Sequence, residues 1–215
     1  MISESLERLR AAIPEGVALV AVSKFHPVER MLQAYDAGQR IFAESRPQEL
    51  AAKVPKMPGD VQWHFIGHLQ TNKLKLVLPY VCMVQSVDSL HLLEAISAWG
   101  KANGRTVDVL LELHLGAEET KQGFTEEEIL SILASEKLDG IRIRGLMGMA
   151  SNTDDMAVVD GEFDRIESLF LKIKSSGREG FDQLSIGMSS DWQLAIRHGA
   201  TMVRIGTDIF GPREY

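Results

Sequence analysis

The sequence contains one cysteine, Cys82, and no long run of apolar residues. A single cysteine excludes a framework of internal disulfide bonds and fits a reducing compartment. No apolar stretch approaches the roughly 20 residues that a membrane-spanning helix needs. The first ten residues carry charges throughout and lack the apolar centre of a secretory signal peptide. We therefore expect a soluble cytoplasmic protein with no membrane partner.

Basic residues are also in the minority. The chain has 23 Lys and Arg against 30 Asp and Glu, which gives a net charge of −7. A nucleic-acid-binding protein normally presents a basic face, so we expect no nucleic-acid partner. No linker, low-complexity tract or internal repeat divides the chain. Residues 1–215 are therefore expected to form one domain with a substantial core.

Strand-like apolar runs alternate with helical patterns along the chain. Strands are expected at 17–23, 40–43, 61–66, 82–86, 107–115, 141–147, 183–187 and 202–206. Helices are expected at about 3–12, 28–37, 46–54, 70–77, 89–102, 125–135, 158–176 and 190–198. Helix-end signals support these bounds: Ser89, a capping box of Thr125 and Glu128, and the stop glycines Gly38, Gly177 and Gly199.

This alternation predicts an α/β fold with a parallel sheet and helical crossovers. Eight strands and eight helices are the count of a single, compact (β/α)8 barrel of the TIM type. A doubly wound open sheet stays as the alternative, because counting strands cannot show closure.

Lys24 lies directly after the first predicted strand. Burying an ammonium group is costly unless it is paired or neutralised. A lysine in such a place becomes a nucleophile near neutral pH and can form a Schiff base with a carbonyl. The alternative is a lysine that reaches solvent or pairs with a carboxylate at a strand end. The barrel fold strengthens the first interpretation without excluding the second, because its chemistry lies at the carboxyl ends of the strands.

Two further segments point to an anionic ligand. After the seventh strand, Ser189, Ser190 and Asp191 are placed to cap the next helix, whose free N–H groups bind anions. An ordinary serine N-cap is the alternative here. The eighth strand and the residues after it offer three suitable groups. Arg204 has a guanidinium fork with a fixed positive charge, Gly206 admits a ligand close to the backbone, and Thr207 carries a hydroxyl. Loops seven and eight of this fold frequently bind phosphate.

His64 and His68 are spaced as metal ligands could be. The glutamate of an H-E-x-x-H helix is missing, however, and Gly67 interrupts a helical register, so we predict no metal site. We expect His64 to point into the barrel mouth, or to be a hydrogen-bonded core histidine. Methionines such as Met147 at the end of the sixth strand are more often core filler than ligand contacts.

Five segments together resemble the pyridoxal phosphate homeostasis protein family, the YggS/PROSC group. They are A-V-S-K (21–24), W-H-F-I-G-H-L-Q-T-N-K (63–73), G-L-M (145–147), S-I-G-M-S-S-D (185–191) and V-R-I-G-T-D-I-F-G (203–211). The resemblance runs from about residue 17 to 211. It implies a single barrel related to the N-terminal domain of alanine racemase, which binds pyridoxal 5′-phosphate (PLP) without an established catalytic reaction.

The resemblance implies roles for particular residues. Lys24 would form the Schiff base with the PLP aldehyde. The phosphate would be held by residues after strands seven and eight: Ser189, Ser190, Gly206 and Thr207. Arg204 would face the pyridine nitrogen, which disfavours a protonated ring and weakens the cofactor as an electron sink.

His64 and Met147 match positions close to the cofactor. One departure concerns the segment after the second strand, where family members read G-E-N and this chain has Ala43, Glu44 and Ser45. Ser45 offers a hydroxyl in place of an amide, so we expect a hydrogen bond near the cofactor to be lost or moved.

The resemblance implies a non-catalytic protein that sequesters PLP and passes it to apo-enzymes, and we expect a monomer. An amino-acid racemase is the alternative, but it needs a second base, a tyrosine in alanine racemase. The tyrosines here are Tyr35, Tyr80 and Tyr215, and none follows a predicted strand at its carboxyl end. A Schiff-base aldolase acting on a sugar phosphate is a third hypothesis.

Overall fold

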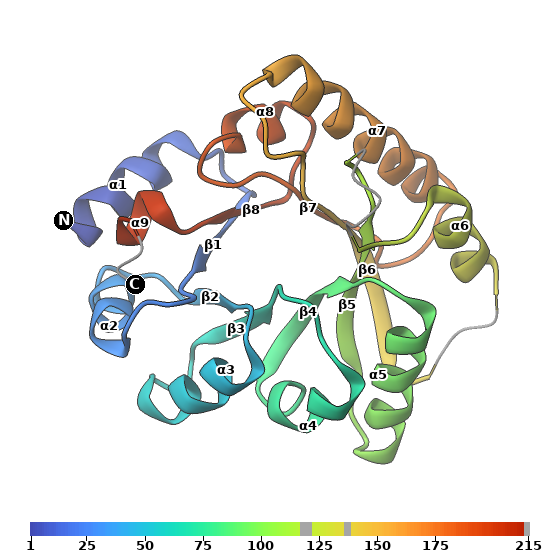
Figure 1. The fold of residues 1–215 in the computed structure, drawn as a ribbon, viewed down its shortest axis with the longest axis horizontal. Helices are drawn as coiled ribbons and strands as arrows, with labels where there is room; N and C mark the ends of the chain where they lie inside the picture. Colours follow the sequence, from blue (N-terminus) through green and yellow to red (C-terminus); the bar gives the residue numbers. More distant parts are fainter. Residues whose placement is uncertain (117–121, 136–138, 213–215) are drawn as a thin grey trace.

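The computed structural model describes residues 1–116, 122–135 and 139–212. Eight parallel strands, neighbours in chain order, form a closed barrel with helices around its outside (Figure 1). The strands are β1 (Ala18–Val22), β2 (Ile41–Glu44), β3 (Gln62–Phe65), β4 (Val81–Val87), β5 (Val107–Leu113), β6 (Ile141–Gly148), β7 (Gln183–Ser185) and β8 (Met202–Ile205). The predicted (β/α)8 barrel is confirmed, and the open sheet is excluded by the pairing of β1 with β8.

The helices follow the prediction with two differences. The α-helices are α1 (Ile2–Ala12), α2 (Val28–Asp36), α3 (Pro47–Lys53), α4 (Leu74–Val77), α5 (Leu90–Ala102), α6 (Glu126–Ala134), α7 (Met156–Ser175), α8 (Trp192–Arg197) and α9 (Thr207–Phe210). The helix expected at 70–77 is a 3-10 turn, η2 (Thr71–Lys73), followed by the short α4; a second 3-10 turn, η1 (Val54–Lys56), extends α3. Helix α9 was not expected. No helix among the described residues is long and apolar enough to cross a membrane.

The predicted helix ends are present. The Ser89 hydroxyl accepts a hydrogen bond from the Leu92 N–H, and Thr125 and Glu128 form a reciprocal capping box. Gly38 and Gly177 follow the C-caps of α2 and α7 with φ of +89° and +78°, a conformation that favours glycine. These local signals fix where the chain leaves each helix and turns into the next strand.

Side chains alternate between two cores along each strand. The inward-facing cluster fills the barrel and consists of Val20, Ala43, Met83, Leu110, Met147 and Met202. The outward-facing side chains join a larger core between the strands and the helices, which includes Phe42, Phe65 and Val203. The barrel is therefore packed in its interior, and any ligand has to bind at an end.

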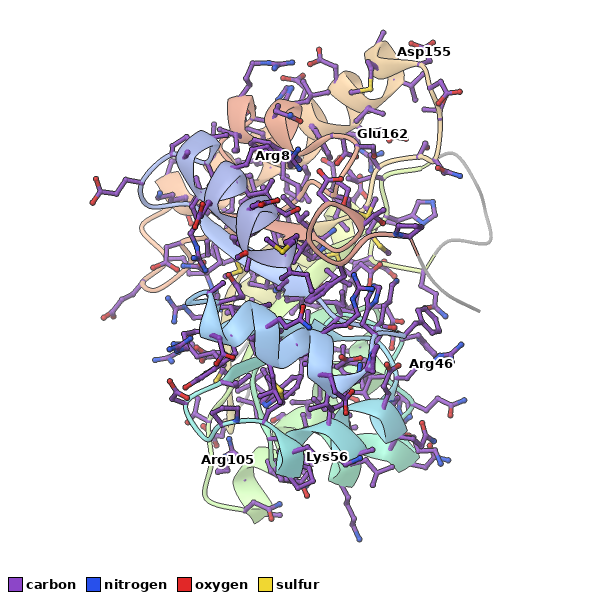
Figure 2. The ribbon with its side chains drawn as sticks, turned by 90° about the vertical axis from the view of Figure 1, so that its left-hand side faces the viewer. Arg8, Arg46, Lys56, Arg105, Asp155 and Glu162 are labelled. Atoms are coloured by element: carbon purple, nitrogen blue, oxygen red, sulfur yellow. The ribbon has the colours of Figure 1, made fainter. Side chains whose placement is uncertain are left out.

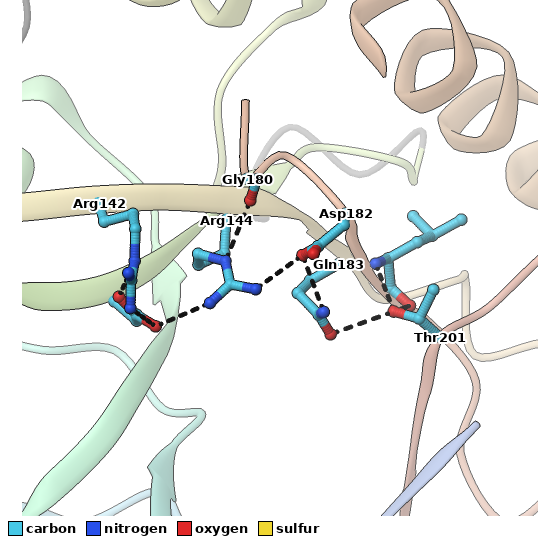
Figure 3. A network of polar contacts seen from close by, with 8 residues as sticks. Arg142, Arg144, Gly180, Asp182, Gln183 and Thr201 are labelled. Atoms are coloured by element: carbon cyan, nitrogen blue, oxygen red, sulfur yellow. Dashed lines mark hydrogen bonds and ion pairs between the residues drawn. The ribbon is translucent and has the colours of Figure 1, made fainter. Parts of the chain in front are cut away.

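The amino ends of the strands carry a network of paired charges (Figure 3). Arg142 and Arg144 on β6 both contact Asp108 on β5, and Arg144 also contacts Asp182 before β7, at 2.9 Å. Thr201 before β8 accepts a hydrogen bond from the Leu184 N–H. In this fold such contacts at the amino end serve stability.

Candidate functional site

Lys24 lies at the carboxyl ends of the strands. Ala18, Val20 and Val22 of β1 pack on the inward cluster, and the next residue in this alternation is Lys24, which is half-buried. Ser23 points outward, because its hydroxyl donates to Glu44 on the outer face of β2 at 2.6 Å. Continued past the end of β1, this alternation predicts that Lys24 faces the inner side of the barrel mouth.

Figure 2 separates the two ends of the barrel. Arg46, which follows β2, lies toward the right of this view, and Arg105, which precedes β5, lies toward the left. The mouth that contains Lys24 is thus on the right. The carboxyl ends of all eight strands, and the loops that follow them, share that side.

Arg204 is buried inside the barrel on β8. One guanidinium nitrogen donates to both the carbonyl and the hydroxyl of Ser185, each at 2.7 Å, and the other donates to the Gly148 carbonyl at 2.9 Å. All three acceptors are neutral, and no described residue forms a salt bridge with Arg204. Burial lowers the pKa of Arg204 to about 10, while the charges of Glu112 and Asp191 oppose this. The predicted fixed positive fork is present.

A chain of hydrogen bonds runs from Arg204 across the interior to His64. The Ser185 hydroxyl contacts Gln85 Oε1 at 2.7 Å, and Gln85 Nε2 contacts His64 Nδ1 at 2.7 Å. Arginine can only donate, so the Ser185 oxygen accepts from Arg204 and its proton goes to Gln85. The Gln85 amide then donates to His64 Nδ1, which leaves the ring proton on Nε2.

This direction requires a neutral His64. Burial lowers the pKa of His64 to about 4, which agrees with an Nδ1 that accepts a hydrogen bond. His64 is therefore the hydrogen-bonded core histidine of the two possibilities, and its Nε2–H is the donor it has left. His68 is exposed, and His64 Nδ1 accepts a hydrogen bond from Gln85.

A carboxyl group that the sequence did not indicate faces the same interior. Glu112, two residues after the inward Leu110 on β5, is buried. Burial raises its pKa to about 7; the charge of Asp88 adds to this, and the charges of Arg204 and His68 oppose it. His68 Nδ1 contacts Asp88 at 2.7 Å above β3 and β4. The mouth thus combines a fixed cation with a carboxyl group that titrates near neutral pH.

The loops after β7 and β8 lie next to each other. The backbone N–H of Arg204 donates to the Gly187 carbonyl at 2.9 Å, which connects the loop after β7 to β8. In that loop Ser189 is half-buried and Ser190 is exposed. The expected side-chain cap of α8 is absent: Asp191 is the N-cap residue, but its carboxylate accepts from the Met188 N–H at 2.5 Å instead.

Gly206 and Thr207 begin the second loop. A Cβ at Gly206 would come within 3.1 Å of the Val22 carbonyl on β1, so strand packing leaves little room for a side chain here. Thr207 is exposed and is the first residue of α9. Helices α8 and α9 follow β7 and β8, so both start at the mouth.

Ser45 and Met147 complete the set of predicted residues. Ser45 is half-buried after β2, and its carbonyl lies so close to Gly67 that a Cβ there would be at 2.2 Å. Met147 is buried in the inward cluster, where it forms the floor beneath the mouth. Glu44, in contrast, points outward toward α3, so the mouth receives Ser45 from this segment and not its neighbour.

Known proteins resemble this chain over nearly its whole length. Residues 1–214 match the family described as alanine racemase, N-terminal domain. A pyridoxal phosphate homeostasis protein of Vibrio alginolyticus is 36% identical over 208 residues, covering 94% of this chain and 89% of the relative. One of Schizosaccharomyces pombe is 35% identical over 221 residues, covering 99% and 93%.

Solved structures agree. PipY of Synechococcus elongatus is 35% identical, and its structures without and with PLP bound have TM-scores of 0.93 and 0.90, each covering 98% of this chain and all of PipY. An alanine racemase of Clostridium difficile, 16% identical, shares the fold with a TM-score of 0.84 over all of this chain and 57% of its own. The chain therefore belongs to the alanine racemase N-terminal domain family and, within it, to the pyridoxal phosphate homeostasis proteins.

Proposed function

We propose that this chain binds PLP at the barrel mouth, covalently through Lys24, and serves to hold the cofactor inside the cell and pass it to apo-enzymes. The observation that supports this best is the placement of Lys24, Arg204 and the β7 and β8 loops at one end of a barrel that closely matches the PLP-bound PipY. The name shared by the curated relatives supports the same role.

The residues present fit the cofactor. When bound, PLP supplies an aldehyde whose carbon forms a C=N bond to a lysine amine with loss of one water. Lys24 offers that amine on the inner side of the mouth. The loops that end in α8 and α9 offer hydroxyls and helix N-termini to a phosphate, through Ser189, Ser190, Gly206 and Thr207.

Arg204 would set the protonation state of the pyridine ring of PLP. A buried group that can only donate hydrogen bonds has to face an acceptor, so a pyridine nitrogen placed against it carries no proton. An unprotonated ring draws electrons weakly from bonds near the amine. Arg204, held by Ser185 and Gly148, therefore favours storage of PLP over catalysis with it.

The racemase alternative lacks a tyrosine at the barrel mouth among the described residues. The Tyr35 hydroxyl donates to Asp60 at 2.6 Å, and Asp60 precedes β3. Tyr80 directly precedes β4. Both tyrosines thus lie at the end of the barrel opposite Lys24, and Tyr215 lies outside the described residues.

Spectroscopy of the purified protein tests the proposal. We expect a yellow protein in which borohydride reduction fixes the cofactor to the peptide that contains Lys24. Lys24→Ala should be colourless, whereas Lys73→Ala, a change of another lysine on the loop after β3, should stay yellow. A colourless wild-type protein that binds sugar phosphates would refute PLP binding. Rapid interconversion of L- and D-alanine would refute the storage role.

A further inference from the structure

A buried ionic cluster lies behind Lys24, on the outer side of the barrel wall. It consists of Lys53 at the end of α3, Glu44 at the end of β2, and Glu49 in α3. The Lys53 ammonium contacts Glu49 Oε1 at 2.6 Å, Glu44 Oε1 at 2.8 Å and the Ser23 carbonyl at 2.9 Å. All three of its N–H donors are thereby used, as a buried ammonium requires.

The cluster forms hydrogen bonds with the residues on both sides of Lys24. The cluster contacts Ser23 at two points, since the Ser23 carbonyl accepts from Lys53 and its hydroxyl donates to Glu44 at 2.6 Å. On the other side the Phe25 N–H donates to Glu49 at 2.7 Å. The residue between these two anchors is Lys24 itself.

The backbone of Phe25 has a conformation that a residue with a large side chain disfavours. Its φ is +69°, the one positive value of a non-glycine residue among those described. A bulky residue adopts this conformation at a cost in free energy, and such conformations persist only where the surroundings hold them. The Glu49 carboxylate and the Arg46 guanidinium, 4.4 Å from the centre of the Phe25 ring, contact Phe25 directly. A backbone hydrogen bond from the His26 N–H to the Ser23 carbonyl, at 3.1 Å, closes the same turn.

Stability alone does not account for the cluster. A buried ion pair is often no more stabilising than apolar side chains of the same size. Here Glu44 Oε2 is buried with no hydrogen-bond partner, and burial raises the pKa of this carboxyl group despite the nearby Lys53. One oxygen of Glu44 thus accepts from both Ser23 and Lys53, while the other stays buried without a partner.

We propose that Lys53 and Glu49 are positioning residues for Lys24, which fix the Ser23–Phe25 backbone so that the lysine amine meets the cofactor aldehyde. This rests on the proposed function. Without the two anchors Phe25 relaxes to a negative φ, which turns the chain at Lys24. The amine then samples many positions, and the advantage of a preset reaction geometry falls.

Two ligands separate positioning from general damage. PLP can react with Lys24, whereas 4-deoxypyridoxine 5′-phosphate has the same ring and phosphate but no aldehyde. We would titrate both into wild type, Lys53→Met and Glu49→Ala, and measure thermal unfolding in parallel. Lys56→Met, an exposed change in the same segment, is the matched control. Glu49 is only partly buried, so Glu49→Ala serves if Lys53→Met does not fold.

Both variants should bind PLP about tenfold more weakly and the deoxy ligand within about twofold of wild type. Equal losses for the two ligands would show a merely structural role and overturn the inference, as would unchanged PLP binding. If wild type itself binds PLP no better than the deoxy ligand, the covalent link of the proposed function fails instead, and that result is visible before any variant is compared.

Discussion

Replacing Glu112 by glutamine tests the electrostatics of the barrel mouth. Burial raises the pKa of Glu112 from 4.5 to about 7. This difference corresponds to about 3 kcal/mol between the neutral and ionised forms in the folded protein. Glutamine has the shape of the protonated side chain and stays neutral at every pH, so Glu112→Gln removes this effect and leaves the packing in place.

The sign follows from the two states of the chain. Unfolded, Glu112 loses its proton near pH 4.5; folded, it keeps the proton until about pH 7. The folded state binds more protons in this interval, so the wild-type contribution to stability falls as the pH rises through it. Above pH 7 the ionised carboxylate destabilises the folded state by about 3 kcal/mol. The opposing attraction to Arg204 is already contained in the raised pKa.

Urea unfolding at several pH values measures this effect. The free energy of unfolding of Glu112→Gln minus that of wild type should increase by about 3 kcal/mol from pH 4.5 to pH 8. Taking the difference cancels the titration of other groups, His64 among them. Glu127→Gln, an exposed change on α6, should show no such trend. A difference that stays constant with pH, or decreases, would refute the assigned environment of Glu112.

Two substitutions away from the mouth should change stability without changing the site. Gly145 has a φ of +157°, and a Cβ there would lie 1.7 Å from the Gln183 carbonyl. Gly145→Ala should therefore separate β6 from β7 and lower the free energy of unfolding by more than about 3 kcal/mol. A loss of less than about 0.5 kcal/mol would contradict this. Asp108→Asn removes the carboxylate shared by Arg142 and Arg144 (Figure 3) and should cost about 1 kcal/mol in urea unfolding, with PLP affinity unchanged because this network lies at the opposite end of the barrel. Weaker PLP binding by Asp108→Asn would show that the two ends are coupled.

The elements could be predicted because their signals are local. The Thr125 and Glu128 capping box, the Ser89 N-cap and the glycine at Gly38 each act within a few residues of the helix end they define. Closure of the barrel is different in kind. It depends on pairing between β1 and β8, which are far apart in sequence, and only the count of elements pointed to it.

Helix α9 was not expected, and the side-chain cap that was expected for α8 is absent. Thr207 begins a helix of one turn, too short for a periodic apolar pattern. Asp191 stands where an N-cap residue is expected, but its carboxylate satisfies the Met188 N–H in the preceding loop. The Met188 N–H and the free N–H groups at the start of α8 both attract the Asp191 carboxylate. The sequence does not show which of these donors lies closer to it.

The candidate site was predictable only where a residue follows a strand directly. Lys24 and Arg204 could be placed from strand ends and strand alternation. The partners of Arg204 could not, since Ser185 and Gln85 come from β7 and β4 and meet only across the barrel interior. Lys53 resembles any polar residue at the end of an amphipathic helix until the barrel brings it under Ser23.

The two ends of the barrel differ in how completely their charges are satisfied. At the amino end, Arg142 and Arg144 meet carboxylates directly, an arrangement that leaves little for a ligand to add. At the mouth, Arg204 contacts neutral oxygens and Glu112 holds its proton up to about pH 7. Unbalanced buried charge destabilises the folded chain, and a ligand that supplies an acceptor recovers that free energy on binding. The same fold therefore places its stability at one end and its capacity to bind at the other.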